Sequence, residues 1–173
     1  MKKTVDAFDY AGHICKSYPK GILITAKMGQ QVNPMTIGWG TMGIEWGRRI
    51  FVAYVRDSRY TRQMLDESGE FTVNVPLGDC DDQILKFCGT KSGRDVDKVA
   101  HLGLTLEPGE AVAVPGIREL PLTLECKILY RVKQPVESIP QDIQKRYYPQ
   151  NAEGQQDFHY AYFAEIVNSY IIE

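Results

Sequence analysis

Two short stretches of the chain combine cationic side chains with hydroxyl groups. The first, Arg56-Asp57-Ser58-Arg59-Tyr60-Thr61, follows an apolar run and precedes a segment with helical spacing. The amino terminus of a helix has unpaired N–H donors and a partial positive charge, so this stretch is a candidate phosphate cradle. In the alternative interpretation, Ser58 is only the N-cap of the helix and the two arginines are solvated.

The second stretch is residues 88–98, where small residues alternate with cations and hydroxyls. Gly93 allows the backbone to turn, so that such groups can gather around one anion. The Gly-Lys-Ser/Thr order of a Walker A motif is absent, which disfavours nucleotide hydrolysis. Alternatively, Asp95 and Asp97 pair with Arg94 and Lys98 in a surface network. The whole chain has a net charge of −2, so the two stretches together predict a local site for one phosphate monoester, which carries about −1.5 to −2 charges.

A glycine pattern precedes both stretches. Gly38-Trp39-Gly40-Thr41-Met42-Gly43 satisfies the G-x-G-x-x-G pattern of dinucleotide-binding proteins. That fingerprint requires a helix at its third glycine and an acidic residue about 20 residues later. Here the chain runs through residues 44–49 into another strand, so a Rossmann fold is not predicted. The glycines could instead leave backbone N–H groups open to a flat ligand, or bend a glycine-rich strand.

The elements that must position these groups are mostly strands. Clusters of β-branched and aromatic residues between turn formers predict strands at residues 22–26, 50–55, 71–75, 122–128 and 158–172. Short helices are predicted at 59–67, closed by Gly69, and at 79–87. The polar stretch 148–157 is predicted to be a surface loop between two strands. This pattern favours a mainly β fold with short helices, a barrel rather than repeated βαβ units.

Two of these strands are apolar on both faces. Residues 22–26 read ILITA and residues 50–55 read IFVAYV. Such runs predict burial on both sides, or one side packed against a second subunit.

Composition limits the classes of protein that the chain can form. A length of 173 residues predicts one domain, and a hydrophobic share of 43% provides a sizeable core. The net charge of −2 argues against a nucleic-acid binder. No apolar run approaches the roughly 18 residues of a membrane span, and the amino terminus does not resemble a secretory signal. We therefore expect a soluble, cytoplasmic protein. The four cysteines and three histidines lack metal-ligand spacing, so no metal site is expected.

Taken together, four segments resemble the flavin reductase-like family, and more narrowly its flavoredoxin-type members. The segments are residues 33–40, 56–61, 71–76 and 88–98, and the resemblance extends from about Tyr18 to Ile172. It implies one FMN-binding domain over residues 1–173, folded as a split β-barrel. It also implies a homodimer with the flavin near the subunit interface.

The resemblance further implies which residues hold the FMN. Four would lie along the isoalloxazine ring and the ribityl chain: Met35, Thr36, Ile37 and Trp39. Eight would reach the phosphate end: Arg56, Ser58, Tyr60, Thr61, Thr90, Ser92, Gly93 and Lys98. The roles of Arg59 and Arg94 stay open. His159 lies in another matching segment, either as a residue that approaches the flavin or as a hydrogen-bonded strand residue. The aromatic side chains of Trp39, Tyr60 and either Tyr160 or Tyr162 are candidates to pack around the cofactor or at a subunit interface.

Three functions are compatible with these residues. The first is an oxidoreductase that passes hydride from NAD(P)H to bound FMN and on to free flavin or another acceptor. The second is an electron carrier without a nicotinamide site, and the third is a barrel that binds another phosphate ligand. No catalytic triad or acid–base pair is recognisable, and a flavin needs none because it carries the redox chemistry itself. No catalytic residue is therefore assigned.

Overall fold

One antiparallel sheet carries the fold, in a computed structural model that describes residues 1–173. Its strand order is β3-β2-β6-β9-β10-β5-β4, and β1 pairs with the far end of β10. Two further strands, β7 and β8, pair with each other. The strands span β1 Lys2–Thr4, β2 Ile22–Met28, β3 Gln31–Ile37, β4 Gly40–Glu45, β5 Arg48–Arg56, β6 Glu70–Val75, β7 Leu106–Glu107, β8 Gly116–Ile117, β9 Leu122–Lys133 and β10 His159–Ile172. The predicted mainly β fold is confirmed, with 39% strand and 25% helix.

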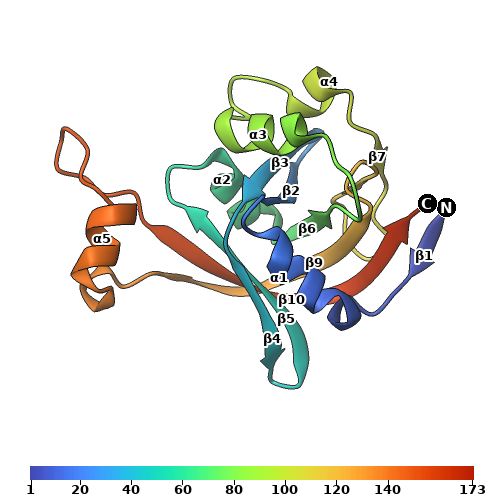
Figure 1. Cartoon of the computed structure of the whole chain (residues 1–173), viewed down its shortest axis with the longest axis horizontal. Helices are drawn as coiled ribbons and strands as arrows, with labels where there is room; N and C mark the ends of the chain where they lie inside the picture. The colour runs from blue at the N-terminus through green and yellow to red at the C-terminus, as the bar shows by residue number, and fades with distance from the viewer.

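The helices are short and lie around the sheet, as Figure 1 shows. They span η1 Ala7–Tyr10, α1 Ala11–Ser17, α2 Tyr60–Ser68, α3 Asp82–Thr90, α4 Lys98–Leu102, η2 Val136–Ser138 and α5 Gln141–Tyr147. None of them has the length and apolar character that a membrane-crossing helix needs. Both helices predicted from the sequence exist, although α3 starts three residues later than expected.

The start of α2 corrects one prediction. Ser58 does not cap this helix, because Arg59 is the N-cap residue and no side chain accepts a hydrogen bond there. At the other end, Gly69 adopts a left-handed conformation with φ of 69°, as the closing glycine of a helix usually does. The Ser58 side chain is thereby available for other contacts.

The sheet is split at one corner. β3 and β4 are neighbours in the chain but lie at opposite ends of the strand order, and only Gly38 and Trp39 join them. The sheet therefore curls without closing through hydrogen bonds, which confirms the predicted split barrel. In Figure 1 the chain leaves β3 and enters β4, which runs beside β5 away from the helices. A cavity lined by Gly38 and Trp39 lies next to this gap and forms part of the candidate site.

β5 is buried on both of its faces, as predicted. Phe51, Ala53 and Val55 point into the main core, where each is fully buried. Ile50 and Val52 point the other way and form a small second cluster with Ala161 of β10. Successive strand residues alternate between faces, so a strand that is apolar throughout joins two apolar layers.

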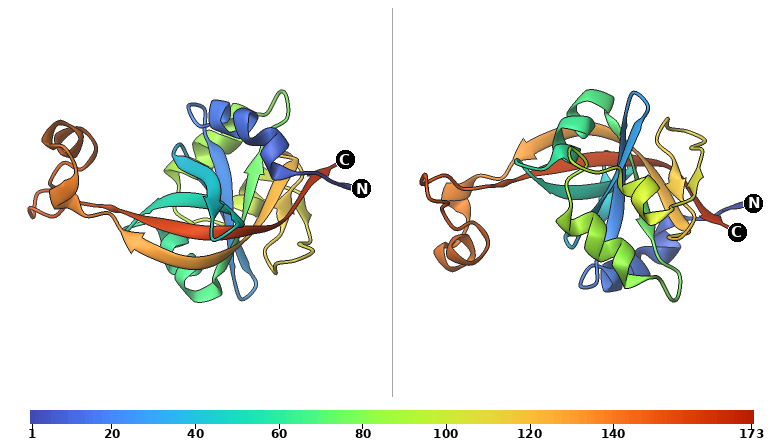
Figure 2. Two further views of the ribbon diagram at one scale, coloured as in Figure 1. Left: turned by 90° about the horizontal axis from the view of Figure 1, so that it is seen from below. Right: turned by 90° about the horizontal axis from the view of Figure 1, so that it is seen from above.

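Residues 134–158 form an excursion between β9 and β10 that carries η2 and α5. Figure 2 shows this excursion projecting from the body of the molecule, at the end opposite the two termini. The stretch 148–157 does lie between two strands, but its first residue, Tyr148, is buried rather than exposed. The excursion is tied back to the barrel through Tyr148 and its neighbours.

Candidate functional site

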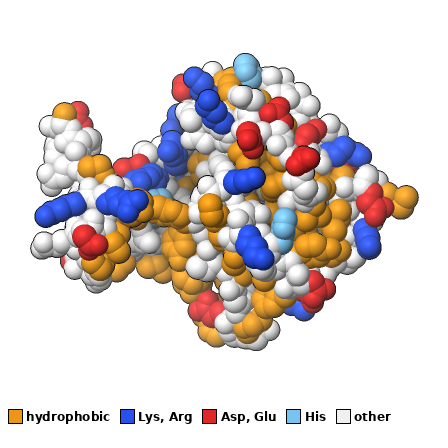
Figure 3. All heavy atoms as spheres, in the orientation of Figure 1, with side chains coloured by type: hydrophobic (Ala, Val, Ile, Leu, Met, Phe, Trp, Pro, Cys, Tyr) orange, Lys and Arg blue, Asp and Glu red, His pale blue; other side chains and the backbone are white.

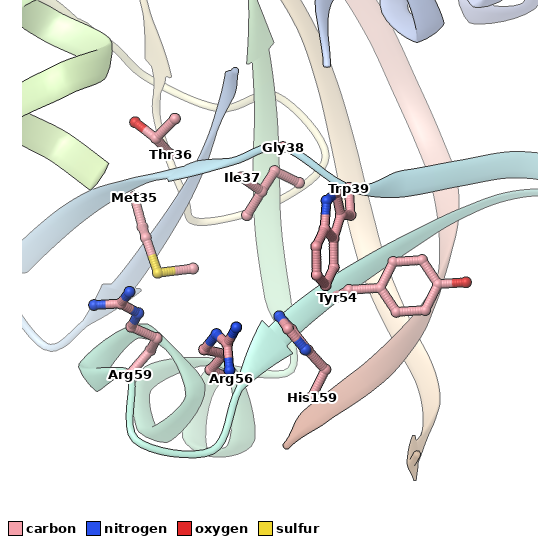
Figure 4. Close-up of a pocket in the computed structure, with 9 residues that line it drawn as sticks. All are labelled: Met35, Thr36, Ile37, Gly38, Trp39, Tyr54, Arg56, Arg59 and His159. Carbon is pink, nitrogen blue, oxygen red and sulfur yellow. The ribbon is translucent and has the colours of Figure 1, made fainter. Parts of the chain in front are cut away.

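Two adjoining cavities lie beside the gap between β3 and β4. The first, which we call the aromatic pocket, has a volume of about 200 Å³. It is lined by Met35, Thr36, Ile37, Gly38, Trp39, Tyr54, Arg56, Arg59 and His159 (Figure 4). These residues come from the end of β3, from β5, from the start of α2 and from β10, so only the fold brings them together.

The second cavity, which we call the cationic pocket, has a volume of about 190 Å³. It is lined by Asn33, Met35, Ser58, Arg59, Tyr60, Thr61, Cys88, Gly89, Lys91, Ser92, Gly93, Arg94 and Lys98. Met35 and Arg59 line both cavities. A single elongated ligand could therefore occupy the two pockets at once.

Four cations and no carboxylate line the cationic pocket. The cations are Arg59, Lys91, Arg94 and Lys98, and none of them forms an ion pair with Asp or Glu. Figure 3 shows basic side chains gathered along the edge of the molecule over α2 and α3. The surface-network alternative for residues 94–98 is wrong, because Asp97 instead caps α4 by accepting from the Ala100 N–H. This unpaired positive charge suits an anion.

Lys98 is the buried member of this set. Its Nζ donates to the carbonyl oxygens of Pro34 at 2.9 Å and Cys88 at 3.0 Å. An ammonium group has three donors, so one is left for a ligand. Burial lowers the pKa of Lys98 to about 8, which still leaves it mostly charged at neutral pH. An anion in the pocket would compensate this buried charge.

Asn33 packs the two sequence stretches against β3. Its side-chain amide donates to Thr61 Oγ1 at 2.9 Å, and its Oδ1 is buried without a hydrogen-bond partner. Gly93 lies so close that a Cβ on it would come within 2.3 Å of that oxygen. Position 93 therefore requires glycine, because the segment around Gly93 lies so close to the Asn33 side chain of β3. The unpartnered Oδ1 of Asn33 could accept a hydrogen bond from a ligand that carries hydroxyl groups.

The wall of the aromatic pocket contains Trp39, which is 38% exposed. Its ring lies 4.8 Å from that of His159 and 5.2 Å from that of Tyr147, which meets it edge-on. Tyr147 ends α5, so the excursion 134–158 contacts the Trp39 wall of this pocket. The arrangement offers an exposed aromatic surface to a flat ligand.

Arg56 and Ser58 attach the excursion to the barrel. The Arg56 guanidinium donates to the carbonyl oxygens of Asp157 at 2.7 Å and Tyr147 at 2.9 Å. Ser58 donates from its N–H and its hydroxyl to the two carboxylate oxygens of Asp157, at 3.0 and 2.7 Å. The resemblance places Arg56 at a phosphate, whereas in the structure it lines the aromatic pocket and holds backbone carbonyls.

His159 begins β10 at the junction of pocket and excursion. It is 6% exposed, and its Nδ1 lies 2.9 Å from the hydroxyl of Tyr148. Burial, with a further contribution from the positive charge of Arg56, lowers the pKa of His159 to about 4. The imidazole is therefore neutral at pH 7, and the aromatic pocket gains no third positive charge.

The structure gathers eleven of the twelve residues predicted to bind the cofactor. Those in the aromatic pocket are Met35, Thr36, Ile37, Trp39 and Arg56, and those in the cationic pocket are Met35 again, Ser58, Tyr60, Thr61, Ser92, Gly93 and Lys98. Thr90 lines neither cavity, since its hydroxyl donates to the Lys86 carbonyl at 2.8 Å in the last turn of α3.

The predictions for the other aromatic residues and for the glycines are met only in part. Tyr60 and Trp39 line the cavities, whereas Tyr160 and Tyr162 lie elsewhere, Tyr162 in the main core with its hydroxyl on Asp66 at 2.7 Å. The space beside Gly40 is filled by the Tyr18 ring, because a Cβ there would meet the Tyr18 hydroxyl at 2.4 Å. The backbone at Gly40 is therefore not open to a ligand. Of the three glycines in the pattern, Gly38 alone lines the aromatic pocket, and none lines the cationic pocket.

Several lining residues had no site role assigned from the sequence, among them Arg59, Arg94, Tyr54 and Asn33. Arg59 and Arg94 stood inside the two motifs, and only the cavity shows that both face it. Tyr54 precedes Arg56 by two residues on β5, so strand alternation could have placed it on the same face. Asn33 gave no signal, because its partners are 28 residues away or farther.

Comparison with known proteins identifies the family. The family described as flavin reductase like domain matches residues 16–142, most of the chain. The chain therefore belongs to the flavin reductase-like family.

Sequence relatives of this chain include two uncharacterized proteins. An uncharacterized protein of Archaeoglobus fulgidus is 31% identical over 116 residues, which are 67% of this chain and 64% of the relative. An uncharacterized protein of Pyrococcus abyssi is 27% identical over 112 residues, 64% of this chain and 63% of the relative. The chain thus spans slightly less than two thirds of the length of these relatives.

Among solved structures, flavoredoxins have a similar fold. Flavoredoxin from Methanosarcina acetivorans has a TM-score of 0.66 at 24% identity, over 88% of this chain and 68% of that one. Flavoredoxin of Desulfovibrio vulgaris has a TM-score of 0.67 at 22% identity, over 88% and 69%. At these identities the likeness concerns the fold alone.

Proposed function

We propose that this chain binds FMN, with the isoalloxazine ring in the aromatic pocket and the phosphate in the cationic pocket. The observation that carries this proposal is the pair of adjoining cavities, which share Met35 and Arg59 but differ in chemistry. One offers an exposed indole, and the other offers four cations without carboxylate partners. Membership of the flavin reductase-like family supports a flavin-related redox function.

Each part of the site has its own task in this proposal. Lys98 and the hydroxyls of the cationic pocket bind the phosphate, while Trp39 contacts the ring. Arg56 and Arg59 place positive charge beside the ring, and a neutral His159 adds none. When bound, the flavin supplies the hydride and electron chemistry. The protein binds the flavin and fixes its orientation through these contacts.

We further propose that NAD(P)H reduces the bound FMN, which passes electrons to free flavin or another acceptor. The alternative is an electron carrier without a nicotinamide site, which the flavin-related family membership supports equally.

Two measurements test these proposals. The chromophore released from the purified protein should be FMN, whereas release of FAD or pyridoxal phosphate, or failure to take up added FMN, would overturn the cofactor assignment. Mixing the FMN-loaded protein with NADH or NADPH in a stopped-flow instrument should bleach the flavin absorbance rapidly for a reductase. Persistent oxidised flavin with both nucleotides would instead establish the carrier.

We also propose that two copies of this chain, each folded as one domain, form a dimer through the outer face of β10 and β9. On that face Phe163 of β10 packs over the buried Val52 of β5, and Tyr130 of β9 stacks on Phe163 with 4.4 Å between ring centroids. Val132 of β9 is 46% exposed beside them, and this apolar area would be covered in a dimer. Light scattering should give twice the chain mass for the wild type and a smaller value for Val132→Glu.

A further inference from the structure

The hydroxyl of Tyr148 lies between two groups that each need an assignment of their proton. It is 2.8 Å from Oε1 of Gln134 and 2.9 Å from Nδ1 of His159. A phenol has one proton to donate, and a carboxamide oxygen can only accept. Tyr148 therefore donates to Gln134. The remaining contact is satisfied only when His159 donates from Nδ1 to the Tyr148 oxygen.

This chain of bonds determines the tautomer of His159. A neutral imidazole carries its proton on one nitrogen and accepts with the other. With the proton on Nδ1, the opposite nitrogen, Nε2, has a free lone pair. A histidine in an ordinary strand position has no such constraint, because solvent satisfies either tautomer.

The free nitrogen faces the site. His159 lines the aromatic pocket, and Figure 4 shows its ring between Arg56 and Trp39. Nδ1 is directed to the excursion, so Nε2 lies on the opposite edge of the ring, and no protein group forms a hydrogen bond with it. The other polar side chains that line this pocket include two arginines, which can only donate. Nε2 of His159 is therefore a hydrogen-bond acceptor in a pocket whose two arginines can only donate.

We propose that Tyr148 is a positioning residue that holds His159 in its Nδ1-protonated form, so that Nε2 accepts a hydrogen bond from an N–H or O–H group of the ligand in the aromatic pocket. Gln134 sets the direction, because it takes the single proton of Tyr148. The ligand part of this inference rests on the proposed FMN function. The tautomer itself does not.

The excursion holds Tyr148 rigidly enough for this role. Tyr148 is 3% exposed, its backbone N–H donates to Gln144 at 2.8 Å, and its carbonyl accepts from Gln156 at 2.5 Å. Gln134 is itself fixed by its backbone N–H, which donates to the carbonyl of His159 at 3.0 Å. The three residues are thus connected through backbone as well as side chains.

Nitrogen-15 spectra of histidine-labelled full-length protein test the tautomer directly. The chain has three histidines, so His159→Gln assigns the signals. The wild type should show protonated Nδ1 and bare Nε2 for His159. In Gln134→Leu the Tyr148 hydroxyl has only Nδ1 to donate to, so the proton should move to Nε2. Tyr148→Phe should give a mixture, and Tyr147→Phe, which removes a neighbouring hydroxyl that forms no hydrogen bond, should match the wild type.

Two results would overturn the inference. Protonated Nε2 in the wild type would do so without any variant, and so would a Gln134→Leu variant that is folded and keeps the wild-type tautomer.

With FMN as probe, binding is followed separately by flavin fluorescence. Bound FMN should shift the nitrogen-15 signal of His159 Nε2. Gln134→Leu should bind FMN about 10-fold more weakly, because the protonated Nε2 of this variant would face the donor group of the ligand. An unchanged Nε2 signal with bound FMN refutes the ligand part, whereas absence of FMN binding refutes the proposed function and leaves the tautomer to the ligand-free spectra.

Discussion

Each of the two pockets contains one buried basic side chain, and these two side chains differ in charge at neutral pH. Burial lowers the pKa of Lys98 in the cationic pocket to about 8 and the pKa of His159 in the aromatic pocket to about 4. At neutral pH Lys98 is therefore charged and His159 is not. The same physical effect gives opposite outcomes because lysine starts far above neutral pH and histidine close to it. Burial thus leaves Lys98 as a charged group that can bind an anion and His159 as a neutral group beside a ring.

The pockets also differ in how the chain builds them. Most of the cationic pocket comes from two continuous stretches, residues 58–61 and 88–98. The aromatic pocket combines one stretch, residues 35–39, with separate residues from three distant elements, Tyr54 and Arg56 of β5, Arg59 at the start of α2 and His159 of β10. Changes in one pocket should therefore affect phosphate binding, and changes in the other should affect ring binding. Four variants break or sharpen this contrast.

Acid should produce the largest effect, by charging the aromatic pocket. The pKa of His159 is lowered in the folded protein, so the unfolded chain binds the proton more tightly. Stability is thus complete above about pH 6.5 and is lost as the pH falls toward 4, by about 3 kcal/mol from this residue at pH 4. Urea unfolding at both pH values should show this loss in the wild type and its absence in His159→Gln. The matched control is His101→Gln, which changes an exposed histidine. If the free energy of unfolding fell equally with pH in all three proteins, the loss of stability could not be assigned to His159.

Gly93→Val should weaken FMN binding by about 100-fold, because the added side chain collides with Asn33 in the cationic pocket. Gly43→Val is the matched control, since a Cβ at Gly43 meets nothing within 4 Å. Fluorescence titration with FMN gives the two dissociation constants. Equal values for the two variants would show that the close approach at Gly93 does not shape the site.

Lys98→Met should weaken FMN binding by about 30-fold and leave riboflavin unaffected, because a charge-assisted bond to phosphate is worth about 2 kcal/mol. In the wild type, the affinity for FMN should fall as the pH rises through about 8, where free Lys98 loses its proton. The variant should lack this pH dependence. A parallel loss of riboflavin binding would mean that Lys98 supports the fold rather than the phosphate.

Trp39→Ala should have the smallest effect, a loss of about 5-fold in flavin affinity, because an aromatic stacking contact is worth about 1 kcal/mol. This loss should be equal for FMN and riboflavin, since both contain the same ring. The matched control is Trp46→Ala, at the tip of the β4–β5 hairpin and outside both pockets. A loss confined to FMN would place the phosphate, rather than the ring, at Trp39.

Much of the fold was predictable from local sequence patterns. β5 is apolar at every position from 50 to 55, which correctly indicated burial of both faces. Gly69 correctly marked the end of α2, because only glycine adopts its left-handed conformation at low cost. Ser58 misled, since a serine before a helix usually caps it, and here Asp157, 99 residues away, binds its hydroxyl instead.

For the candidate site, the sequence alone determined the groups that lie close together in the chain. Within each of the stretches 56–61 and 88–98, the cations and hydroxyls stay within a limited distance of one another, because a segment spans at most about 3.3–3.6 Å per residue. The tertiary structure decided the rest. It turned Lys98 inward and Thr90 away, and it brought Trp39, Arg56 and His159 together from positions up to 120 residues apart. Such contacts depend on strand pairing, and pairing partners are set by the burial of the whole sheet rather than by any local pattern.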